Sequence, residues 1–385
     1  WKATATDEFN LNEFNAGDYV EAVAKKNLAE QITMVLYPND ASENGKELRL
    51  RQQYFLASAS LQDVLAQHLE NYTDFSQFSQ KNCFQLNDTH PTIAIAELMR
   101  LLMDEHKLPW DDAWSITQAT MAYTNHTLLP EALERWPVRL FKELLPRLLD
   151  IIYEINARFL SQVAQRWPGD TARQRRMSLI EEGDEPMVRM AYLGIVGSFS
   201  INGVAALHSR LLVEDLFKDF YDLWPSKFNN KTNGVTPRRW LSHCNPALAN
   251  LITQCIGPSW QKDLSKLQDL KTFIHDKSFT DQWASIKQAN KERLSDLIKM
   301  NTGVVFSPQS LFDIQVKRIH EYKHQLLNIM HVIHLYFAIT EDGYKLPVPR
   351  TFIFAGKAAP GYFMAKLIIK LINSLIIIQY IRTNE

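Results

Sequence analysis

The chain has 385 residues, which exceeds the usual size of one domain and therefore predicts two. Its formal net charge is -1, so composition gives no reason to expect nucleic acid or an anionic membrane surface as a partner. Three widely spaced cysteines show no metal-ligand spacing, and they predict a reducing, cytoplasmic compartment. Only 13 glycines favour a helix-rich fold, and no apolar run is long enough to span a bilayer.

In chain order, apolar residues recur first at helical spacing. They predict helices over 20–36, 47–69, from Pro91 onward, and over 137–166. A Pro-Asn-Asp-Gly loop separates the first two. The charged stretch 170–187 predicts an exposed, irregular connection, and the apolar run 192–199 predicts a buried strand followed by a helix from about Gly203. The first half of the chain is therefore expected to be mainly helical.

Turn residues are dense over 229–237, and we place a domain boundary there. Beyond it, the pattern predicts helices to about 300, strands over 303–306 and 311–316, a helix over 319–338, a strand over 351–355, and a helix to about 373. Strand, glycine-containing turn and helix in succession indicate a parallel α/β sheet. Ligands bind such sheets beyond the carboxyl ends of the strands.

A basic cluster follows the strand predicted at 311–316 and includes Lys317, Arg318 and Lys323. Cations at a strand end and a helix start suit a phosphate group, because free backbone N–H groups and the helix dipole also favour anions there. A solvated basic surface explains the same residues equally well. The residues alone leave both interpretations open.

Three other stretches carry polar residues at turns. Asn233 lies in a loop suited to hydrogen bonding a sugar hydroxyl, although an inter-domain linker is the simpler interpretation. Asp88 and His90 precede a predicted helix. Two interpretations are open for them: they orient a ligand, or they cap the helix. His126 presents the same choice between a ligand contact and a structural histidine. No nucleophile-elbow or paired-carboxylate pattern occurs. The residues alone therefore predict no more than a two-domain, helix-rich α/β protein with an anion-binding site near the C-terminal end of the chain.

Taken together, collinear motifs resemble the α-glucan phosphorylase family, that is, the glycogen and maltodextrin phosphorylases. The matching stretches are 27–30, 35–40, 45–50, 86–91, 123–136, 202–205, 231–240, 315–323 and 356–362. The short loop near 41–44 and the Trp-Asp-Asp-Ala-Trp stretch at 110–114 resemble the bacterial maltodextrin type most.

The resemblance implies an α/β, helix-rich fold with two Rossmann-like domains of the GT-B glycosyltransferase type, both incomplete. It implies phosphorolysis of an α-1,4-glucan, maltodextrin or glycogen, to glucose 1-phosphate. It also implies pyridoxal 5′-phosphate as cofactor, no metal, a cytoplasmic location and a homodimeric parent enzyme. The cofactor phosphate acts in this family as a proton shuttle to the substrate phosphate, so two phosphate groups must lie close together, which requires cations to offset their repulsion.

The resemblance also assigns residues. Arg318 and Lys323 would bind the substrate phosphate, and His126 would offer its backbone carbonyl near the reacting sugar. Asn233 would hydrogen-bond a glucose hydroxyl. Asp88 and His90 would lie in the entrance region for the glucan, and these three are the expected substrate-binding residues. Lys317 would contact the cofactor phosphate, and Trp240 would pack against the cofactor.

Where the sequence departs from the family pattern, it predicts a fragment truncated at both ends. The motif with the Schiff-base lysine is absent, and 374–385 do not resemble the family. We therefore expect residues 1–233 to be the later part of the N-terminal catalytic domain, 234–373 the first part of the cofactor domain, and 374–385 a divergent tail. This fragment is expected to be inactive alone. Alternatives are a non-catalytic glucan-binding remnant and a transferase that uses a nucleotide sugar.

Overall fold

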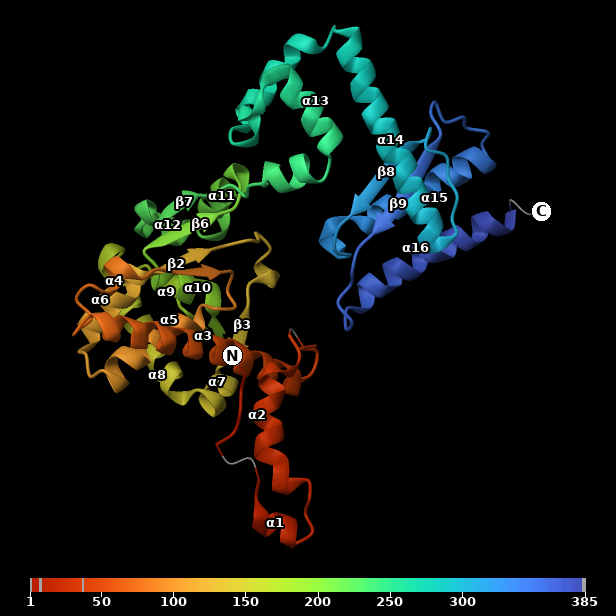
Figure 1. The fold of residues 1–385 in the computed structure, drawn as a ribbon. Coiled ribbons are helices and arrows are strands. Elements are labelled where there is room, and N and C mark those ends of the chain that lie inside the picture. The colour runs from red at the N-terminus through yellow and green to blue at the C-terminus, as the bar shows by residue number, and fades with distance from the viewer. Residues whose placement is uncertain (1, 7–8, 37, 383–385) are drawn as a thin grey trace. The chain divides into compact units, whose positions relative to one another are not determined.

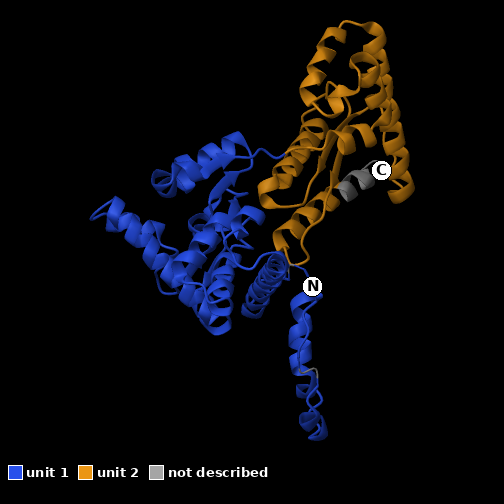
Figure 2. Ribbon diagram, turned by 60° about the vertical axis from the view of Figure 1, so that its left-hand side comes forward, with its two compact units in different colours: residues 1–233 blue, residues 234–385 orange. Residues whose placement is uncertain are grey.

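The computed structural model describes the backbone of residues 2–6, 9–36 and 38–382, with side chains up to residue 375 in the final helix. The chain divides into two compact units, Trp1–Asn233 and Gly234–Glu385, which Figure 2 shows in different colours. The turn-rich stretch 229–237 contains this division. Each unit has its own parallel sheet and its own core residues.

The first unit contains helices α1 to α12 and strands β1 to β7, in the order that Figure 1 shows. Its helices are α1 Leu11–Asn15, α2 Ala24–Met34, α3 Glu43–Asn71, α4 Phe78–Lys81, α5 Ile93–Arg100, α6 Trp110–Thr120, α7 Val138–Leu144, α8 Pro146–Arg166, α9 Thr171–Met177, α10 Met190–Val196, α11 Ala206–Leu211 and α12 Lys218–Leu223. Its strands are β1 Phe84–Asn87, β2 Met121–Thr124, β3 Arg135–Pro137, β4 Ile180–Glu181, β5 Met187–Arg189, β6 Ser200–Gly203 and β7 Phe228–Asn230.

The main sheet of this unit has the strand order β1-β2-β6-β7, and its paired strands are parallel. Because the strands are parallel, their carboxyl ends meet at one edge, where Asn87, Thr124, Asn202 and Asn230 are the last or nearly the last strand residues. A second, antiparallel sheet has the order β3-β5-β4. The connections that leave the main sheet at its carboxyl edge carry the polar motifs found in the sequence.

Helices α5 and α10 lie under the main sheet, with α3 and α8 in a further layer (Figure 1). Helix α5 has apolar residues on nearly every side and is buried from Ile93 to Met99, as expected for a helix between a sheet and other helices. Gly197 follows α10 and lies close against α5. A Cβ at residue 197 would lie 2.6 Å from the Ile95 side chain, so this close approach requires glycine. The core of the unit is therefore one continuous apolar cluster that joins the main sheet to helices α3, α5, α8 and α10.

Three expectations for this unit are wrong or incomplete. Residues 192–199 do not form a strand, because most of them belong to helix α10; an apolar run of that length suits a buried helix as well as a strand. The stretch 170–187 is not irregular, since Asp170 caps helix α9 and Met177 to Ile180 are buried. The helix predicted over 137–166 is two helices, because Pro146 follows Leu145, whose ψ of 54° is not helical.

The second unit contains helices α13 to α16 and strands β8 and β9. Their bounds are α13 Pro246–Ile256, α14 Lys277–Thr302, α15 Gln325–Thr340, α16 Phe363–Arg382, β8 Leu311–Val316 and β9 Arg350–Ala355. Strands β8 and β9 are parallel and pair along their whole length. The predicted parallel sheet is confirmed, with two strands among the residues that the structure describes rather than the three expected.

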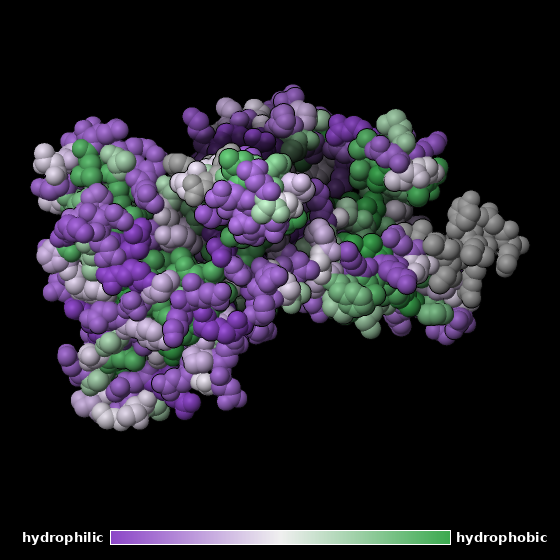
Figure 3. Space-filling view, turned by 90° about the horizontal axis from the view of Figure 1, so that it is seen from below, coloured by the Kyte–Doolittle hydropathy of each residue, from purple (hydrophilic) through white to green (hydrophobic). Residues whose placement is uncertain are grey.

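This unit has two small apolar cores. One lies between the strand pair and helices α15 and α16, around Ile329, Val332 and Ile368, and the other lies on α13 around Ile252 and Trp260. Small cores leave apolar side chains at the surface, which appear as green areas in Figure 3. In this unit they include Leu327 and Met330 of α15 and Phe363 of α16.

Two boundaries differ from expectation here. No strand forms over 303–306; Gly303 instead ends α14 in the left-handed region, with φ +76°. Helix α15 begins at Gln325 rather than near 319, because His324 has φ +63° and the preceding residues make a separate turn. Helix α16 continues past residue 373 into the stretch expected to be a divergent tail, of which residues 383–385 and the side chains from 376 onward lie outside the described residues.

Candidate functional site

Uncharged polar side chains line the carboxyl edge of the main sheet. His126 Nε2 lies 2.5 Å from Asn87 Oδ1, which links the segments that follow β2 and β1. Thr124 Oγ1 donates to Asn202 Oδ1 at 2.8 Å, which links β2 to β6. The parallel topology brings these residues together, because each stands at the end of a neighbouring strand. Amides, hydroxyls and imidazoles without a dominant net charge suit a neutral ligand that is rich in hydroxyl groups.

Asp88 directly follows β1 and has φ +71°, a left-handed conformation that is uncommon for a residue with a Cβ. Two hydrogen bonds hold it there: its backbone N–H donates to Thr124 O at 3.0 Å, and its Oδ1 accepts from Thr89 N at 2.6 Å. His90 is half-buried two residues further on. Strained backbone that its surroundings hold in place is a frequent property of functional sites. The structure thus places Asp88, His90 and His126 on adjacent strand ends.

The sequence reading missed Glu134, whose carboxylate is enclosed near His90. Gln53 Nε2 donates to Glu134 Oε1 at 2.8 Å, and among the described residues Oε2 has no hydrogen-bond partner. Burial raises the pKa of Glu134, while the Gln53 hydrogen bond and the charges of His90 and Arg49 oppose that rise. The only sequence signal was its position in the motif at 123–136.

Asn233 is the last residue of the first unit and is exposed. Its backbone N–H donates to Val204 O at 3.0 Å, and Lys231 N donates to Gly203 O at 3.1 Å. These two bonds continue the pairing of β6 with β7 beyond the strands themselves. The predicted sugar contact at Asn233 is therefore anchored to the segment that follows β6, on the same carboxyl edge as His126.

In the second unit, cations gather where β8 and β9 end. Lys317 and Arg318 follow β8, Lys357 follows β9, and Lys323 ends the turn Glu321–Lys323. Among the described residues, none of these four makes an ion pair with a carboxylate. Lys323 Nζ lies 4.7 Å from the centre of the Tyr322 ring. Cations that lack an internal counter-ion are available to bind an anion such as phosphate.

Backbone and amide contacts fix this cluster. Gln325 Nε2 donates to Arg318 O at 3.0 Å, and Gln315 Nε2 donates to Lys323 O at 2.8 Å. Gly356 is required at the end of β9, since a Cβ there would lie 2.0 Å from Lys317 O. The segments after the two strands can therefore run side by side only with glycine at that position. Gly356 was visible in the sequence as a strand-to-helix turn, but its contact with Lys317 was not.

Trp240 lies on the helical turn Arg238–His243, which packs beside α13. Its side chain is 64% exposed. The structure thus places Trp240 on the part of the second unit built around α13, and Lys317, Arg318 and Lys323 on the part built around β8 and β9. The expected cofactor contact of Trp240 stays a prediction.

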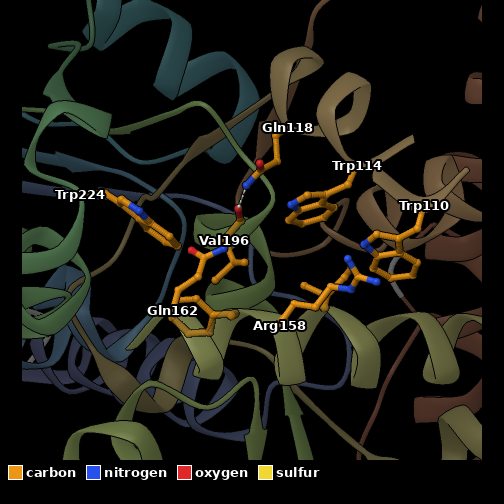
Figure 4. Close-up of a pocket in the computed structure, with 9 residues that line it drawn as sticks. Trp110, Trp114, Gln118, Arg158, Gln162, Val196 and Trp224 are labelled. Carbon is orange, nitrogen blue, oxygen red and sulfur yellow. Dashed lines mark hydrogen bonds between the residues drawn. The ribbon is translucent and has the colours of Figure 1, made fainter. Parts of the chain in front are cut away.

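Two cavities lie elsewhere on the first unit. Trp110, Trp114 and Trp224 surround one of about 20 Å³, in which Gln118 Nε2 donates to Val196 O at 2.9 Å (Figure 4). That volume accommodates about one water molecule. Its walls come from helices α6 and α8 and from Val196 and Trp224, which precede β6 and β7. A second cavity, of about 460 Å³, is lined by charges that pair internally, such as Arg176 with Asp219.

Over the described residues, no group of three or more His, Cys, Asp or Glu side chains could hold a metal ion. Likewise, none of the helices in the described part of the chain is both long and apolar enough to cross a membrane.

The fold and these edges define a helix-rich α/β protein with parallel sheets in two units. A family model described as carbohydrate phosphorylase matches residues 1–381. Curated relatives include glycogen phosphorylase of Synechocystis, 56% identical over 97% of this chain and 44% of the relative. They also include the muscle form of glycogen phosphorylase from Bos taurus, 54% identical over 97% of this chain and 46% of the relative.

This chain belongs to the carbohydrate phosphorylase family. It spans less than half the length of the curated relatives that it matches. The expected resemblance and the helix-rich α/β class are confirmed. The family match extends to residue 381 and so includes most of the stretch from 374 that we expected to diverge.

Proposed function

We propose that this chain supplies glucan- and phosphate-binding surfaces of an α-glucan phosphorylase, which cleaves an α-1,4-glucan with inorganic phosphate to give glucose 1-phosphate. The observation that carries the proposal is the cation cluster at the ends of β8 and β9, which has no carboxylate partner in the described part of the chain. Phosphorolysis requires an anion site of this kind, because phosphate replaces water as the attacking group. The polar, largely uncharged edge of the first unit supports the choice of a sugar as the other reactant.

The donor set of the second unit fits phosphate groups. Lys317 would hold the phosphate of pyridoxal 5′-phosphate, Arg318 and Lys323 would hold inorganic phosphate, and Trp240 would pack against the cofactor ring. When bound, this cofactor supplies a phosphate that exchanges a proton with the substrate phosphate. The lysine that binds the cofactor covalently in this family belongs to a motif that this sequence does not contain.

The residues of the chain then have separable tasks. Arg318 and Lys323 offset the repulsion between two neighbouring phosphates, since like charges at close range otherwise exclude each other. Asn233 and the Asn87–His126 pair orient sugar hydroxyls by hydrogen bonding. The backbone carbonyl of His126 would stabilise positive charge that develops on the sugar as the glycosidic bond breaks. Asp88 and His90 would guide the glucan. The proposal includes a homodimeric parent enzyme. It also includes a cytoplasmic location, and the free cysteines Cys83, Cys244 and Cys255 support this reducing compartment.

Binding experiments test both surfaces of this chain. Titration with maltoheptaose tests the first unit, and titration with pyridoxal 5′-phosphate tests the second. We expect Arg318→Ala and Lys323→Ala each to weaken binding of inorganic phosphate, titrated separately, by about tenfold, because each removes a charge-assisted hydrogen bond. Lys287→Ala is the matched control, since Lys287 is an exposed lysine on α14. Equal binding by all three variants and the unchanged chain would refute the anion site.

Turnover distinguishes the alternatives. We expect the chain alone to release no glucose 1-phosphate from maltoheptaose and phosphate, even with the cofactor added. Saturable maltoheptaose binding together with no binding of pyridoxal 5′-phosphate would instead support a non-catalytic glucan-binding protein. Transfer of glucose from a nucleotide sugar would support the third alternative and contradict phosphorolysis.

A further inference from the structure

His208, on α11, contacts two different segments through its two ring nitrogens. Nδ1 accepts a hydrogen bond from Val204 N at 2.9 Å, and Nε2 lies 3.1 Å from Asn125 Oδ1. A backbone N–H can only donate, so Nδ1 carries no proton and the neutral ring holds its proton on Nε2. The Nε2–H group therefore donates to Asn125. Both ring nitrogens therefore have partners, and the ring also interacts with the backbone of Thr127, in the same turn as Asn125.

Asn125 is fully buried, and two hydrogen bonds besides the one with His208 show which way its side-chain amide faces. Its Oδ1 accepts from Thr127 N at 3.1 Å, and its Nδ2 donates to the hydroxyl of Tyr123 at 3.3 Å. The oxygen must therefore face both Thr127 and His208. These bonds define the turn that carries His126, because Asn125 and Thr127 are its immediate neighbours in the chain. The position of the His126 backbone depends on Asn125, and Asn125 is held by His208.

On the other side of the ring, Val204 is hydrogen-bonded to both His208 and Asn233 through its own backbone. Val204 N donates to His208, and Val204 O accepts from Asn233 N at 3.0 Å. Gly203 allows this approach, since a Cβ there would lie 2.9 Å from His208 Nδ1 and 2.4 Å from Ser209 Oγ. A single imidazole thus connects, through one residue on each side, the two segments that carry His126 and Asn233.

We propose that His208 is a positioning residue for glucan binding, which holds the His126 turn and the Asn233 segment in register with each other. This inference rests on the proposed function, because His126 and Asn233 are the sugar contacts in it. A histidine that served only to fasten α11 to the sheet would need one hydrogen bond to the sheet. His208 instead divides its two bonds between the two predicted sugar-binding segments.

Two substitutions separate the two roles of the ring. His208→Asn retains an acceptor near the position of Nδ1 and loses the donor to Asn125, whereas His208→Gln retains a donor near Nε2 and loses the acceptor for Val204. His68→Asn is the control for general loss of stability. His68 is also buried in the first unit, with Nε2 2.9 Å from Asp74 O, but it lies near the far end of α3.

The first readout is NMR of the full chain with nitrogen-15 in histidine and in selected backbone amides. We expect the His208 ring to show the proton on Nε2. We also expect His208→Asn to shift mainly the Thr127 amide, and His208→Gln mainly the Val204 and Asn233 amides. A proton on Nδ1, or variants that shift both segments equally or neither, would overturn the proposed coupling.

The second readout is the affinity for maltoheptaose. We expect each of the two variants to bind about tenfold more weakly, because a displaced segment loses roughly one hydrogen bond to the sugar. His68→Asn should bind like the unchanged chain. Unchanged affinity in both His208 variants would overturn the proposal. If the unchanged chain binds no maltoheptaose, the proposed function fails, and the NMR readout alone then decides whether His208 couples the two segments.

Discussion

Lys227 is an unusual lysine because it is partly buried without a carboxylate partner among the described residues. It directly precedes β7, and its Nζ lies 4.1 Å from the centre of the Trp224 ring and 3.5 Å from the carbonyl oxygens of Ile195 and Val196. Those carbonyls belong to the last turn of α10, so the cation faces the negative end of a helix. Burial nevertheless lowers the pKa of Lys227 from 10.5 to about 8.

The sign of the pH effect follows from this shift. Below about pH 8 the lysine is charged in both states, and the folded state bears the full cost of burying the charge. Between about pH 8 and pH 10.5 the unfolded chain binds more protons than the folded chain, so the free energy of unfolding rises with pH. At ~1.4 kcal/mol for each pH unit, the cost at neutral pH is at most about 3 kcal/mol, since the partly exposed side chain retains some hydration.

Replacing Lys227 with Met removes the charge and keeps most of the volume. The variant loses the Trp224 contact and two long hydrogen bonds, together about 2 kcal/mol. We therefore expect Lys227→Met to be more stable than the unchanged chain by about 1 kcal/mol near pH 7, and less stable by about 1 kcal/mol near pH 9.5. The difference in free energy of unfolding should change by roughly 2 kcal/mol between those two pH values.

Urea unfolding of the first unit, measured for both proteins at each pH, tests this expectation. Comparing the two proteins at the same pH cancels the titration of every other group. Lys142→Met is the control, because Lys142 is exposed on α7 of the same unit and its replacement should give a difference that does not vary with pH. A difference for Lys227→Met that stays constant from about pH 7 to about pH 9.5 would refute the argument that burial governs this lysine.

Two further substitutions test the two strand edges. Gly356→Ala should destabilise the second unit by about 2 kcal/mol or more, because the added Cβ meets Lys317 O and a backbone atom cannot move aside. Hydrogen exchange of the β8 and β9 amides measures this, and Gly183→Ala, which has open space around it, should leave exchange unchanged. Glu134→Gln should stabilise the first unit increasingly as pH rises from about 4.5 to about 7, since burial raises the pKa of Glu134 and ionisation at higher pH therefore costs stability. Urea unfolding at both pH values measures this, and a gain that does not grow with pH would contradict it.

The sequence by itself determined the class of fold and the family. Helical spacing located α3 and the helices of the second unit, and strand patterns located β8 and β9, because these elements bury one face and so carry a clear period. It also determined the chemistry available at each motif, for instance the cations that begin at Lys317. These properties depend on residues that are close together in the chain.

Only the tertiary structure decided which motifs meet. That α10 is a helix rather than a strand follows from its position under the sheet, where a helix and a strand would have equally apolar sequences. Parallel pairing brings Asn87, His126 and Asn202 to one edge although they lie far apart in the sequence. His208, Glu134 and Gly356 acquire their roles only through contacts across that distance. Their local sequence carries no such information, since the physical requirement in each case is set by an atom of another segment.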